Sequence, residues 1–198
     1  MKKVERLGVF GGTFDPPHIG HLALAERARD RLRLDRVLFV PAGQPPHKHR
    51  AGMSSAADRL AMTRLAVRGA PAFRVSTMEL RADGPSFTAR TVRTLERPGR
   101  HLFLLVGADS LDDFRTWRDY EDILERVTLT VADRPGAGFP ASRAWARRRP
   151  VAWIGNPPLD VSSTMIRTLA RTGCSIRYLV PDAVARYIER RALYRSRR

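Results

Sequence analysis

Two histidines, His18 and His21, lie three residues apart near the start of the chain. The apolar run 7–10 before them is typical of a buried strand, and residues 22–28 after them have the composition of a helix. The connection holds a pair of glycines, which permit close backbone approach, and a pair of prolines, which stiffen it. A helix N-terminus offers free N–H groups and the positive end of the helix dipole. Because residues i and i+3 share a helix face, the pair predicts a phosphate site that can also stabilise developing negative charge.

The same stretch has two other interpretations. The histidines could be ordinary capping or core residues of a strand–turn–helix connection. A zinc site needs three or four ligands, and the nearby candidates Asp15, His47 and His49 lack a typical metal spacing. We therefore expect no metal held by the protein's own side chains. The glycine pattern matches neither the Walker A loop nor the Gly-x-Gly-x-x-Gly dinucleotide motif.

A second polar segment lies in the last quarter of the chain. The hydroxyl residues Ser162, Ser163 and Thr164 precede a predicted helix over 165–171, and Arg167 lies within its first turn. Hydroxyls at a helix start can cap it beside its free N–H groups, and an arginine can grip phosphate oxygens with two parallel bonds. An ordinary capped helix with a surface arginine is the alternative, which these residues alone leave open.

The two segments together resemble the nucleotidylyltransferase superfamily, whose hallmark is His-x-Gly-His after the first strand. Residues 162–167 resemble its second ATP motif, and the stretch around His18 is similar to the bacterial nicotinate-nucleotide adenylyltransferase family in particular. The resemblance runs from about residue 7 to 194. Class I aminoacyl-tRNA synthetases share the first motif, but they would need a Lys-Met-Ser-Lys-Ser-like loop and a far longer chain, and this sequence has neither.

The resemblance implies transfer of AMP from ATP to nicotinate mononucleotide, giving nicotinate adenine dinucleotide and pyrophosphate in NAD biosynthesis. Nicotinamide mononucleotide and phosphopantetheine are alternative acceptors. It implies Mg²⁺ with ATP, held mainly by phosphate and water. The residues implied as catalytic are His18, His21 and Arg167. Those implied for ATP are Gly12, Thr13, Phe14, Lys48, Gly107, Asp109, Ser162, Ser163 and Thr164. Those implied for the mononucleotide are Thr88, Trp117 and Arg118.

The residues around Gly107 and Asp109 also point to a ligand on their own. They follow the run 101–106, whose continuous apolar character indicates a strand buried on both faces. Parallel sheets bind ligands at the carboxyl ends of such strands. Asp109 could accept hydrogen bonds from ribose hydroxyls, or it could cap a short helix over 110–114.

Three other positions have open interpretations. Lys48 lies in the long loop 42–55 and could contact phosphate or be a solvated surface lysine. Trp117 could stack on a pyridine ring or anchor the core. Thr88 matches the family's Ser-Tyr-Thr segment, but the acidic residue that follows in the family is Arg90 here.

Composition narrows the class of protein further. The 198 residues and 43% hydrophobic content predict one globular domain over 1–198, with possible homo-oligomers. A net charge of +16 favours anionic partners such as nucleotides or nucleic acid, but no recognisable nucleic-acid motif is present, so we expect no nucleic-acid partner. No membrane-length apolar run or secretory leader is found, and Cys174 is the one cysteine. These features predict a cytoplasmic protein without membrane contact.

Strand and helix patterns alternate along the chain, which predicts an α/β fold with a Rossmann-like, doubly wound parallel sheet of the nucleotidylyltransferase type. The helix over 56–68 has Leu60, Ala61, Leu65 and Ala66 on its predicted apolar face. The expected strands are 7–10, 36–41, 73–80, 101–106, 127–132 and 151–154. The other expected helices end at 95 and 126 or span 142–149 and 182–191.

Overall fold

The computed structural model describes residues 3–45, 52–133, 145–146, 151–155, 157 and 159–195, without the side chain of Asp109. Its strands are β1 (Glu5–Gly12), β2 (Arg36–Pro41), β3 (Phe73–Val75), β4 (Arg100–Gly107), β5 (Val127–Asp133) and β6 (Val151–Gly155). Its helices are α1 (Ile19–Arg31), α2 (Ala56–Ala66), α3 (Thr88–Leu95), α4 (Ala108–Asp112), α5 (Tyr120–Arg126), α6 (Ser163–Arg171) and α7 (Asp182–Arg190), with a 3₁₀ turn, η1, at Phe114–Thr116.

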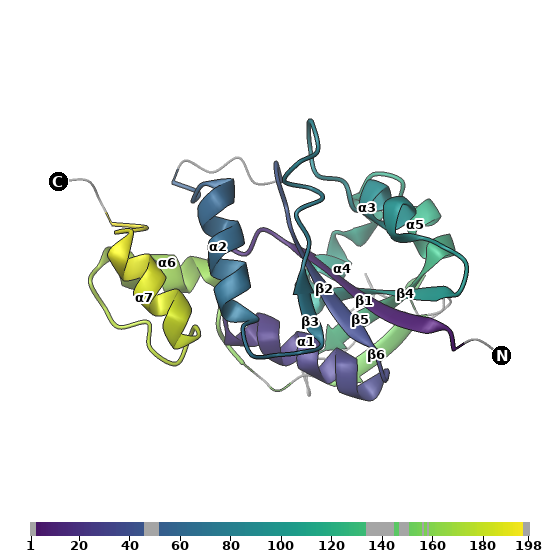
Figure 1. Ribbon diagram of the computed structural model, residues 1–198, viewed down its shortest axis with the longest axis horizontal. Helices are drawn as coiled ribbons and strands as arrows, with labels where there is room; N and C mark the ends of the chain where they lie inside the picture. The colour runs from purple at the N-terminus through teal and green to yellow at the C-terminus, as the bar shows by residue number, and fades with distance from the viewer. Residues whose placement is uncertain are drawn as a thin grey trace.

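The strands form one parallel sheet in the order β3-β2-β1-β4-β5-β6 (Figure 1). The predicted α/β, Rossmann-like sheet is confirmed. β1 and β4 are neighbours at the centre, and the strand order runs outward from them in opposite directions. Such a reversal opens a crevice beyond the carboxyl ends of the two central strands, where ligands of open parallel sheets bind.

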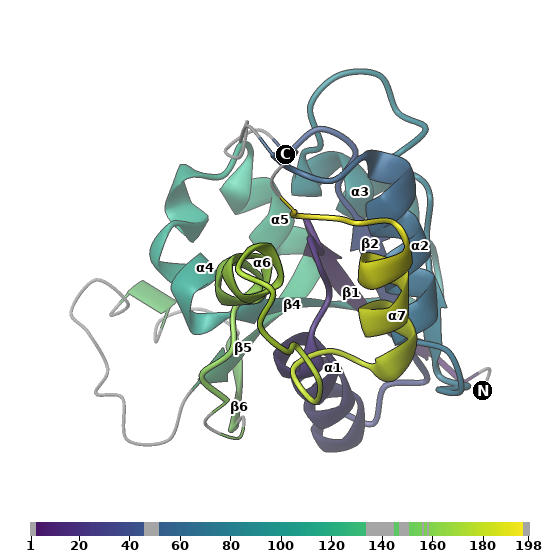
Figure 2. The ribbon, with the colours of Figure 1, turned by 90° about the vertical axis from the view of Figure 1, so that its left-hand side faces the viewer.

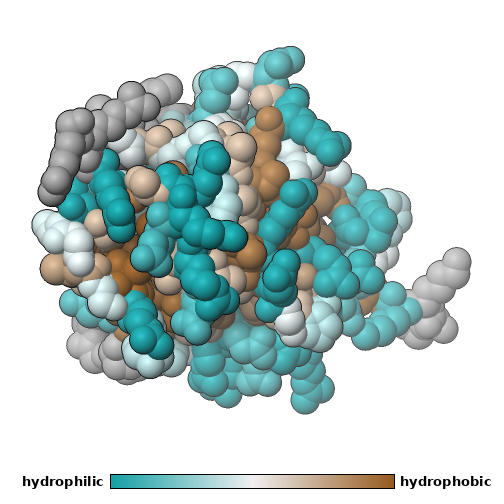
Figure 3. Space-filling view, turned by 60° about the vertical axis from the view of Figure 1, so that its left-hand side comes forward, coloured by the Kyte–Doolittle hydropathy of each residue, from teal (hydrophilic) through white to brown (hydrophobic). Residues whose placement is uncertain are grey.

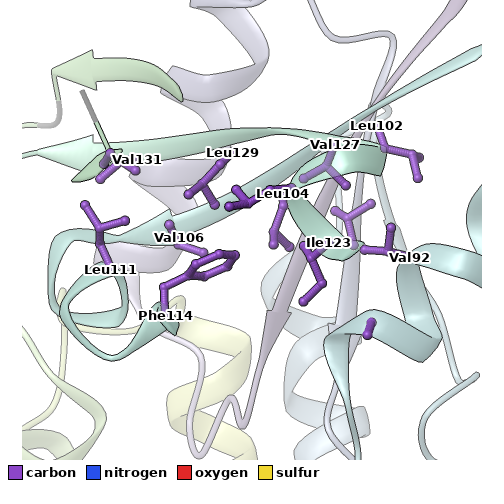
Figure 4. Close-up of a cluster of buried hydrophobic side chains, with 14 of the residues drawn as sticks. Val92, Leu102, Leu104, Val106, Leu111, Phe114, Ile123, Val127, Leu129 and Val131 are labelled. Atoms are coloured by element: carbon purple, nitrogen blue, oxygen red, sulfur yellow. The ribbon is translucent and has the colours of Figure 1, made fainter. Parts of the chain in front are cut away.

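The central strand β4 is buried on both faces, as its apolar run predicts. Leu102 and Leu104 point into a cluster with α3, α4 and α5, which Figure 4 shows in close-up. Phe103 and Leu105 point the other way, into a cluster that contains buried residues of α1. Side chains alternate across a strand, so these two clusters lie on opposite faces of the sheet and fix its place between the helices.

A third cluster joins the C-terminal helices to α2. Met62 of α2 packs with Ile166 of α6 and with Val184 and Ile188 of α7, all of them buried. α7 lies beside α2 in both ribbon views (Figures 1 and 2). This packing holds the start of α6 against the carboxyl edge of the sheet.

The predicted helix over 56–68 is confirmed as α2, but its predicted face is wrong in part. The structure buries Arg59, Met62, Thr63 and Ala66, which are spaced by three and four residues. A pattern of hydrophobic residues does not identify a buried arginine. Arg59 is buried because backbone carbonyls surround its guanidinium group.

The predicted strand over 73–80 is wrong beyond Val75, where β3 ends. The amide of Met78 donates to the hydroxyl of Ser76, which turns the chain out of the sheet. The backbone then crosses the loop after β2 so closely that a Cβ at Gly43 would lie 2.2 Å from the carbonyl oxygen of Glu79. Only glycine permits this approach.

Two other predicted helices differ from the structure or are described only in part. The second polar helix begins at Ser163, two residues earlier than predicted, with Ser162 as its cap. The predicted helix over 142–149 lies outside the described residues except for positions 145 and 146.

The surface on the side of α6 and α7 carries mostly hydrophilic side chains, with hydrophobic ones visible between them (Figure 3). Among the described residues, none of the helices combines the length and the apolar character that a membrane span requires.

Candidate active site

A cavity of about 760 Å³ lies where the carboxyl ends of β1 and β4 face the start of α6. Most predicted site residues line it: Gly12, Thr13, Phe14, His18, His21, Gly107, Ser162, Ser163, Thr164 and Arg167. Among the described lining residues, Arg171 and Arg195 add positive charge, and Asp15 is the only carboxylate. The cavity therefore favours an anionic ligand.

The two histidines sit at the start of α1, with their ring centroids 3.7 Å apart. The backbone N–H of His18 donates to Nδ1 of His21 at 3.1 Å, which places the proton of a neutral His21 ring on Nε2. Burial lowers the pKa of His18 to about 4, so its ring is neutral at pH 7. Its buried Nδ1 has no hydrogen-bond partner in the described part of the chain.

Gly20, between the histidines, allows the ring of His18 to approach the chain that leads into α6. A Cβ at this position would lie 3.1 Å from Nδ1 of His18 and 3.1 Å from a methyl carbon of Val161. Contacts of that length force a neighbour to move. A side chain in place of Gly20 would therefore shift the His18 ring or Val161 by a few tenths of an ångström.

Gly12 and Phe14 form the turn after β1. Phe14 adopts a left-handed backbone with φ of 51°, and its ring folds back so that a Cβ at Gly12 would lie 2.9 Å from it. The Phe14 ring is buried among Phe10 and Phe39. The side chain of Phe14 thus belongs to the core, and Phe14 is also one of the residues that line the cavity.

The start of α6 is bonded directly to the loop that precedes α1. The hydroxyl of Ser163 donates to the carbonyl oxygen of Pro16 at 2.8 Å, and Nη1 of Arg167 donates to that of Asp15 at 2.7 Å. Nη2 of Arg167 also donates to Oγ1 of Thr164 at 3.0 Å. These bonds join residues that are 147 and 152 positions apart in the chain. The two predicted phosphate segments therefore line the same cavity.

Buried Arg59, which sequence reasoning missed, supports the loops around the cavity. Its guanidinium group donates to the carbonyl oxygens of Thr13 at 3.1 Å, Ala42 at 2.5 Å and Gly43 at 3.0 Å. Burial lowers its pKa, and the nearby Asp15 carboxylate opposes that shift. Arg59 thereby holds the chain after β1 and the chain after β2 at fixed positions.

Thr88, Trp117 and Arg118 lie outside the cavity lining but close to one another. The Arg118 guanidinium stacks 4.9 Å above the ring of Phe87, the residue before Thr88. Trp117 is half-buried, with its ring centroid 5.0 Å from that of Phe114 in the core. The structure gathers these three residues without placing them on the wall that the histidines share.

This second group is bonded to the loop after β2. The hydroxyl of Ser86 accepts hydrogen bonds from the amides of Gly43 and Gln44 at 2.9 and 3.3 Å. Glu79 accepts a hydrogen bond from Thr91 at 2.5 Å, and burial raises the pKa of Glu79. Hydrogen bonds thus tie the start of α3 to the loop after β2.

Two predicted positions are described only in part or not at all. Lys48 lies outside the described residues, as do His47 and His49 of the zinc alternative. The backbone of Asp109 lies in α4, whose cap is Gly107, so Asp109 is not the helix cap. Across the described residues, no group of three or more His, Cys, Asp or Glu side chains could hold a metal ion.

Comparison with known proteins gives consistent matches. The Cytidylyltransferase-like family model matches residues 9–169. A "Probable nicotinate-nucleotide adenylyltransferase" of Geobacter sulfurreducens is 44% identical, over 96% of this chain and 98% of its own. A protein of Roseiflexus sp. with the same name is 45% identical, over 96% of this chain and 98% of its own length. The solved structure of Plasmodium falciparum nicotinic acid mononucleotide adenylyltransferase complexed with NaAD is similar in fold, with a TM-score of 0.80 at 16% identity over 96% of this chain and 97% of that one.

Proposed function

Because this chain belongs to the Cytidylyltransferase-like family and, within it, to the nicotinate-nucleotide adenylyltransferases, we propose that its cavity transfers AMP from ATP to nicotinate mononucleotide. The products are nicotinate adenine dinucleotide and pyrophosphate, a step of NAD biosynthesis. The observation that carries the proposal is the meeting of two helix starts, those of α1 and α6, at one basic cavity.

The reaction needs no protein nucleophile. A phosphate oxygen of the mononucleotide, already ionised at neutral pH, forms a bond to the α-phosphorus of ATP. The bond from that phosphorus to the α,β-bridging oxygen breaks, and pyrophosphate leaves with the electron pair. Alignment of the two substrates can contribute about 7–11 kcal/mol to the lowering of the barrier. The remaining task of the protein is to stabilise the charge that develops on the phosphate oxygens.

The histidine pair is suited to the α-phosphate end of ATP. Nε2–H of His21 would donate to the oxygen on which negative charge develops. His18 is neutral at pH 7 because its pKa is about 4, so it would contribute a hydrogen bond and no positive charge. The free N–H groups at the start of α1 add donors of fixed direction, as do the backbone N–H groups of Gly12, Thr13 and Phe14.

The start of α6 is suited to the β- and γ-phosphates. The hydroxyls of Ser162, Ser163 and Thr164 stand beside free helix N–H groups, and Arg167 brings a guanidinium group held by the carbonyl of Asp15. Arginine can bind two phosphate oxygens at once, so it would neutralise the leaving pyrophosphate.

Mg²⁺ would enter with ATP, bound mainly to phosphate oxygens and water, and would neutralise part of the triphosphate charge. The side chains that line the cavity agree with a metal ion held mainly by the substrate. Asp15, the one carboxylate among the described lining residues, already accepts a hydrogen bond from Tyr194 and one from the amide of Ser54. A protein cage for the metal is absent from the described residues.

The mononucleotide would bind on the side of Thr88, Trp117 and Arg118. A pyridine ring can stack on tryptophan, and the guanidinium group of Arg118 can attract the nicotinate carboxylate. Gly107, Asp109 and Lys48 remain proposed contacts of ATP. We assign the protein to the cytoplasm, with these two small molecules and no nucleic acid as its partners.

The test is pyrophosphate release from ATP, Mg²⁺ and nicotinate mononucleotide by the purified protein. His21→Ala should lower kcat by about 100- to 1,000-fold, as removal of an oxyanion donor does. His101→Ala is the matched control, because His101 lies at the opposite end of β4 and bonds only Thr128 among the described hydrogen bonds. Normal turnover by His21→Ala would refute the site, and no turnover by the wild-type protein would refute the function.

A further inference from the structure

The described chain ends in a short segment, Leu193–Arg195, that follows α7 and reaches back to the cavity. Figure 2 shows the yellow backbone leaving α7 in this direction. Ala192 and Tyr194 adopt left-handed backbones with φ of 47° and 67°, which L residues rarely do. The amide of Leu193 donates to the carbonyl of Ile188 at 3.0 Å, which fixes the turn. Both Tyr194 and Arg195 line the cavity.

The hydroxyl of Tyr194 is anchored inside the site. It donates to Oδ1 of Asp15 at 2.7 Å, and Asp15 is only 4% exposed. Burial and the Asp15 carboxylate raise the pKa of Tyr194, so its hydroxyl keeps its proton at neutral pH and remains a donor. A hydrogen bond to a buried carboxylate is among the stronger ones in proteins, and without it the Asp15 carboxylate keeps only the longer bond from the amide of Ser54, at 3.4 Å, among the described hydrogen bonds.

Asp15 is also the residue that holds Arg167. Its carbonyl oxygen accepts from Nη1 of Arg167 at 2.7 Å, and the next carbonyl, that of Pro16, accepts from Ser163 at 2.8 Å. Tyr194 therefore fixes the side chain of the residue whose backbone fixes Arg167. Asp15 thus links Tyr194 to Arg167, and the residue after it, Pro16, accepts the bond from Ser163.

We propose that Tyr194 is a positioning residue for adenylyl transfer, acting through Asp15 on Arg167 and on the triphosphate. The proposal rests on the proposed function of the same cavity. Tyr194 itself need not touch the reacting atoms. Its role is to hold the loop before α1 at the place where Asp15 and Pro16 meet α6.

The structure supplies a matched control in Tyr187. This residue of α7 donates from its hydroxyl to Oδ1 of Asp58 at 2.8 Å, so it also joins the C-terminal part of the chain to a buried aspartate. Asp58 lies in α2, and neither Tyr187 nor Asp58 lines the cavity. Tyr187→Phe removes the same kind of bond without changing the loop before α1.

The experiment compares Tyr194→Phe with Tyr187→Phe in the full chain. Both should lower the melting temperature by a similar amount. Only Tyr194→Phe should raise the KM for ATP and weaken MgATP binding in calorimetry, each by about tenfold, the typical effect of one lost hydrogen bond to a charged group. The KM for nicotinate mononucleotide should stay unchanged, because the Thr88 side is held by other bonds.

A second comparison separates positioning from general loosening. In the background of Arg167→Lys, Tyr194→Phe should have little further effect on MgATP binding, because both changes break the same chain of contacts. Equal ATP affinity in the Tyr194→Phe and Tyr187→Phe variants, or full additivity with Arg167→Lys, would overturn the inference. Absence of turnover in the wild-type protein would refute the proposed function instead, while MgATP calorimetry would still test the role of Tyr194.

Discussion

Because His18 is buried, we expect the free energy of unfolding of the protein to fall at acid pH. The side chain is 7% exposed, and burial lowers its pKa from 6.5 to about 4. Between these values the unfolded chain binds a proton at His18 that the folded chain does not. The resulting stability is therefore fully present above about pH 6.5 and is lost as the pH falls toward 4.

The size of the effect follows from the two pKa values. The free energy of unfolding should fall by about 2 kcal/mol between pH 8 and pH 5 through His18 alone, and by about 3 kcal/mol below pH 4. In His18→Gln, which carries no titrating ring, this loss of stability at acid pH should disappear. Near pH 8, where His18 is neutral in both the folded and the unfolded chain, the free energy of unfolding should depend on pH in the same way in both proteins.

Urea unfolding at pH 5, 6.5 and 8, at one ionic strength, measures the difference. The slope of the free energy against urea must stay constant, so that the midpoints report stability. Other titrating groups contribute equally to both proteins and cancel in the comparison. Equal losses of stability in the wild type and in His18→Gln between pH 8 and pH 5 would refute the view that folding keeps this histidine neutral.

Two further substitutions test the packing between the helix starts. Gly20→Ala should lower kcat/KM by about tenfold, because the new Cβ meets His18 and Val161 at 3.1 Å; Gly155→Ala, whose Cβ meets nothing within 4 Å, is the control, and equal kinetics would contradict the prediction. Arg167→Lys should raise the KM for ATP by about 10- to 100-fold, because lysine cannot form the bidentate guanidinium contact with phosphate, and should leave the KM for the mononucleotide unchanged. Steady-state kinetics with each substrate varied in turn measures both KM values. An equal rise in the two KM values would contradict the assignment.

The part of the cavity formed by the two helix starts could be predicted because its sequence signals are local. A buried strand, a glycine–proline turn and a helix start follow one another within a few residues, and hydroxyls with an arginine mark the start of α6. That both lie at the carboxyl edge of the sheet follows from the alternation of strands and helices. The structure confirms that His18 and Arg167 line one cavity.

The supporting residues could not be predicted, because their partners are distant in sequence. Arg59 interrupts the apolar face of α2, and a pattern based on hydrophobicity assigns it to solvent. It is buried where four backbone carbonyls accept hydrogen bonds from it, those of Thr13, Ala42, Gly43 and Ser54. Tyr194 likewise lies in an unremarkable tail, and its partner Asp15 is 179 positions away.

The region of Thr88, Trp117 and Arg118, which we propose for the mononucleotide, was the least predictable part. β3 ends at Val75, and the backbone of Glu79 beyond it passes close to Gly43, which no periodicity in the sequence reveals. The roles of Thr88, Trp117 and Arg118 remain predictions, as do those of Asp109 and Lys48. One domain over residues 1–198 is also still a prediction.

The most direct test of the central claim is a crystal structure of the protein with Mg²⁺ and a non-hydrolysable ATP analogue. We predict one triphosphate in the cavity, with its α-phosphate within hydrogen-bond distance of Nε2 of His21 and its β- or γ-phosphate on Arg167 and Ser163. A triphosphate that contacts only one of the two helix starts, or that binds outside this cavity, would contradict the account.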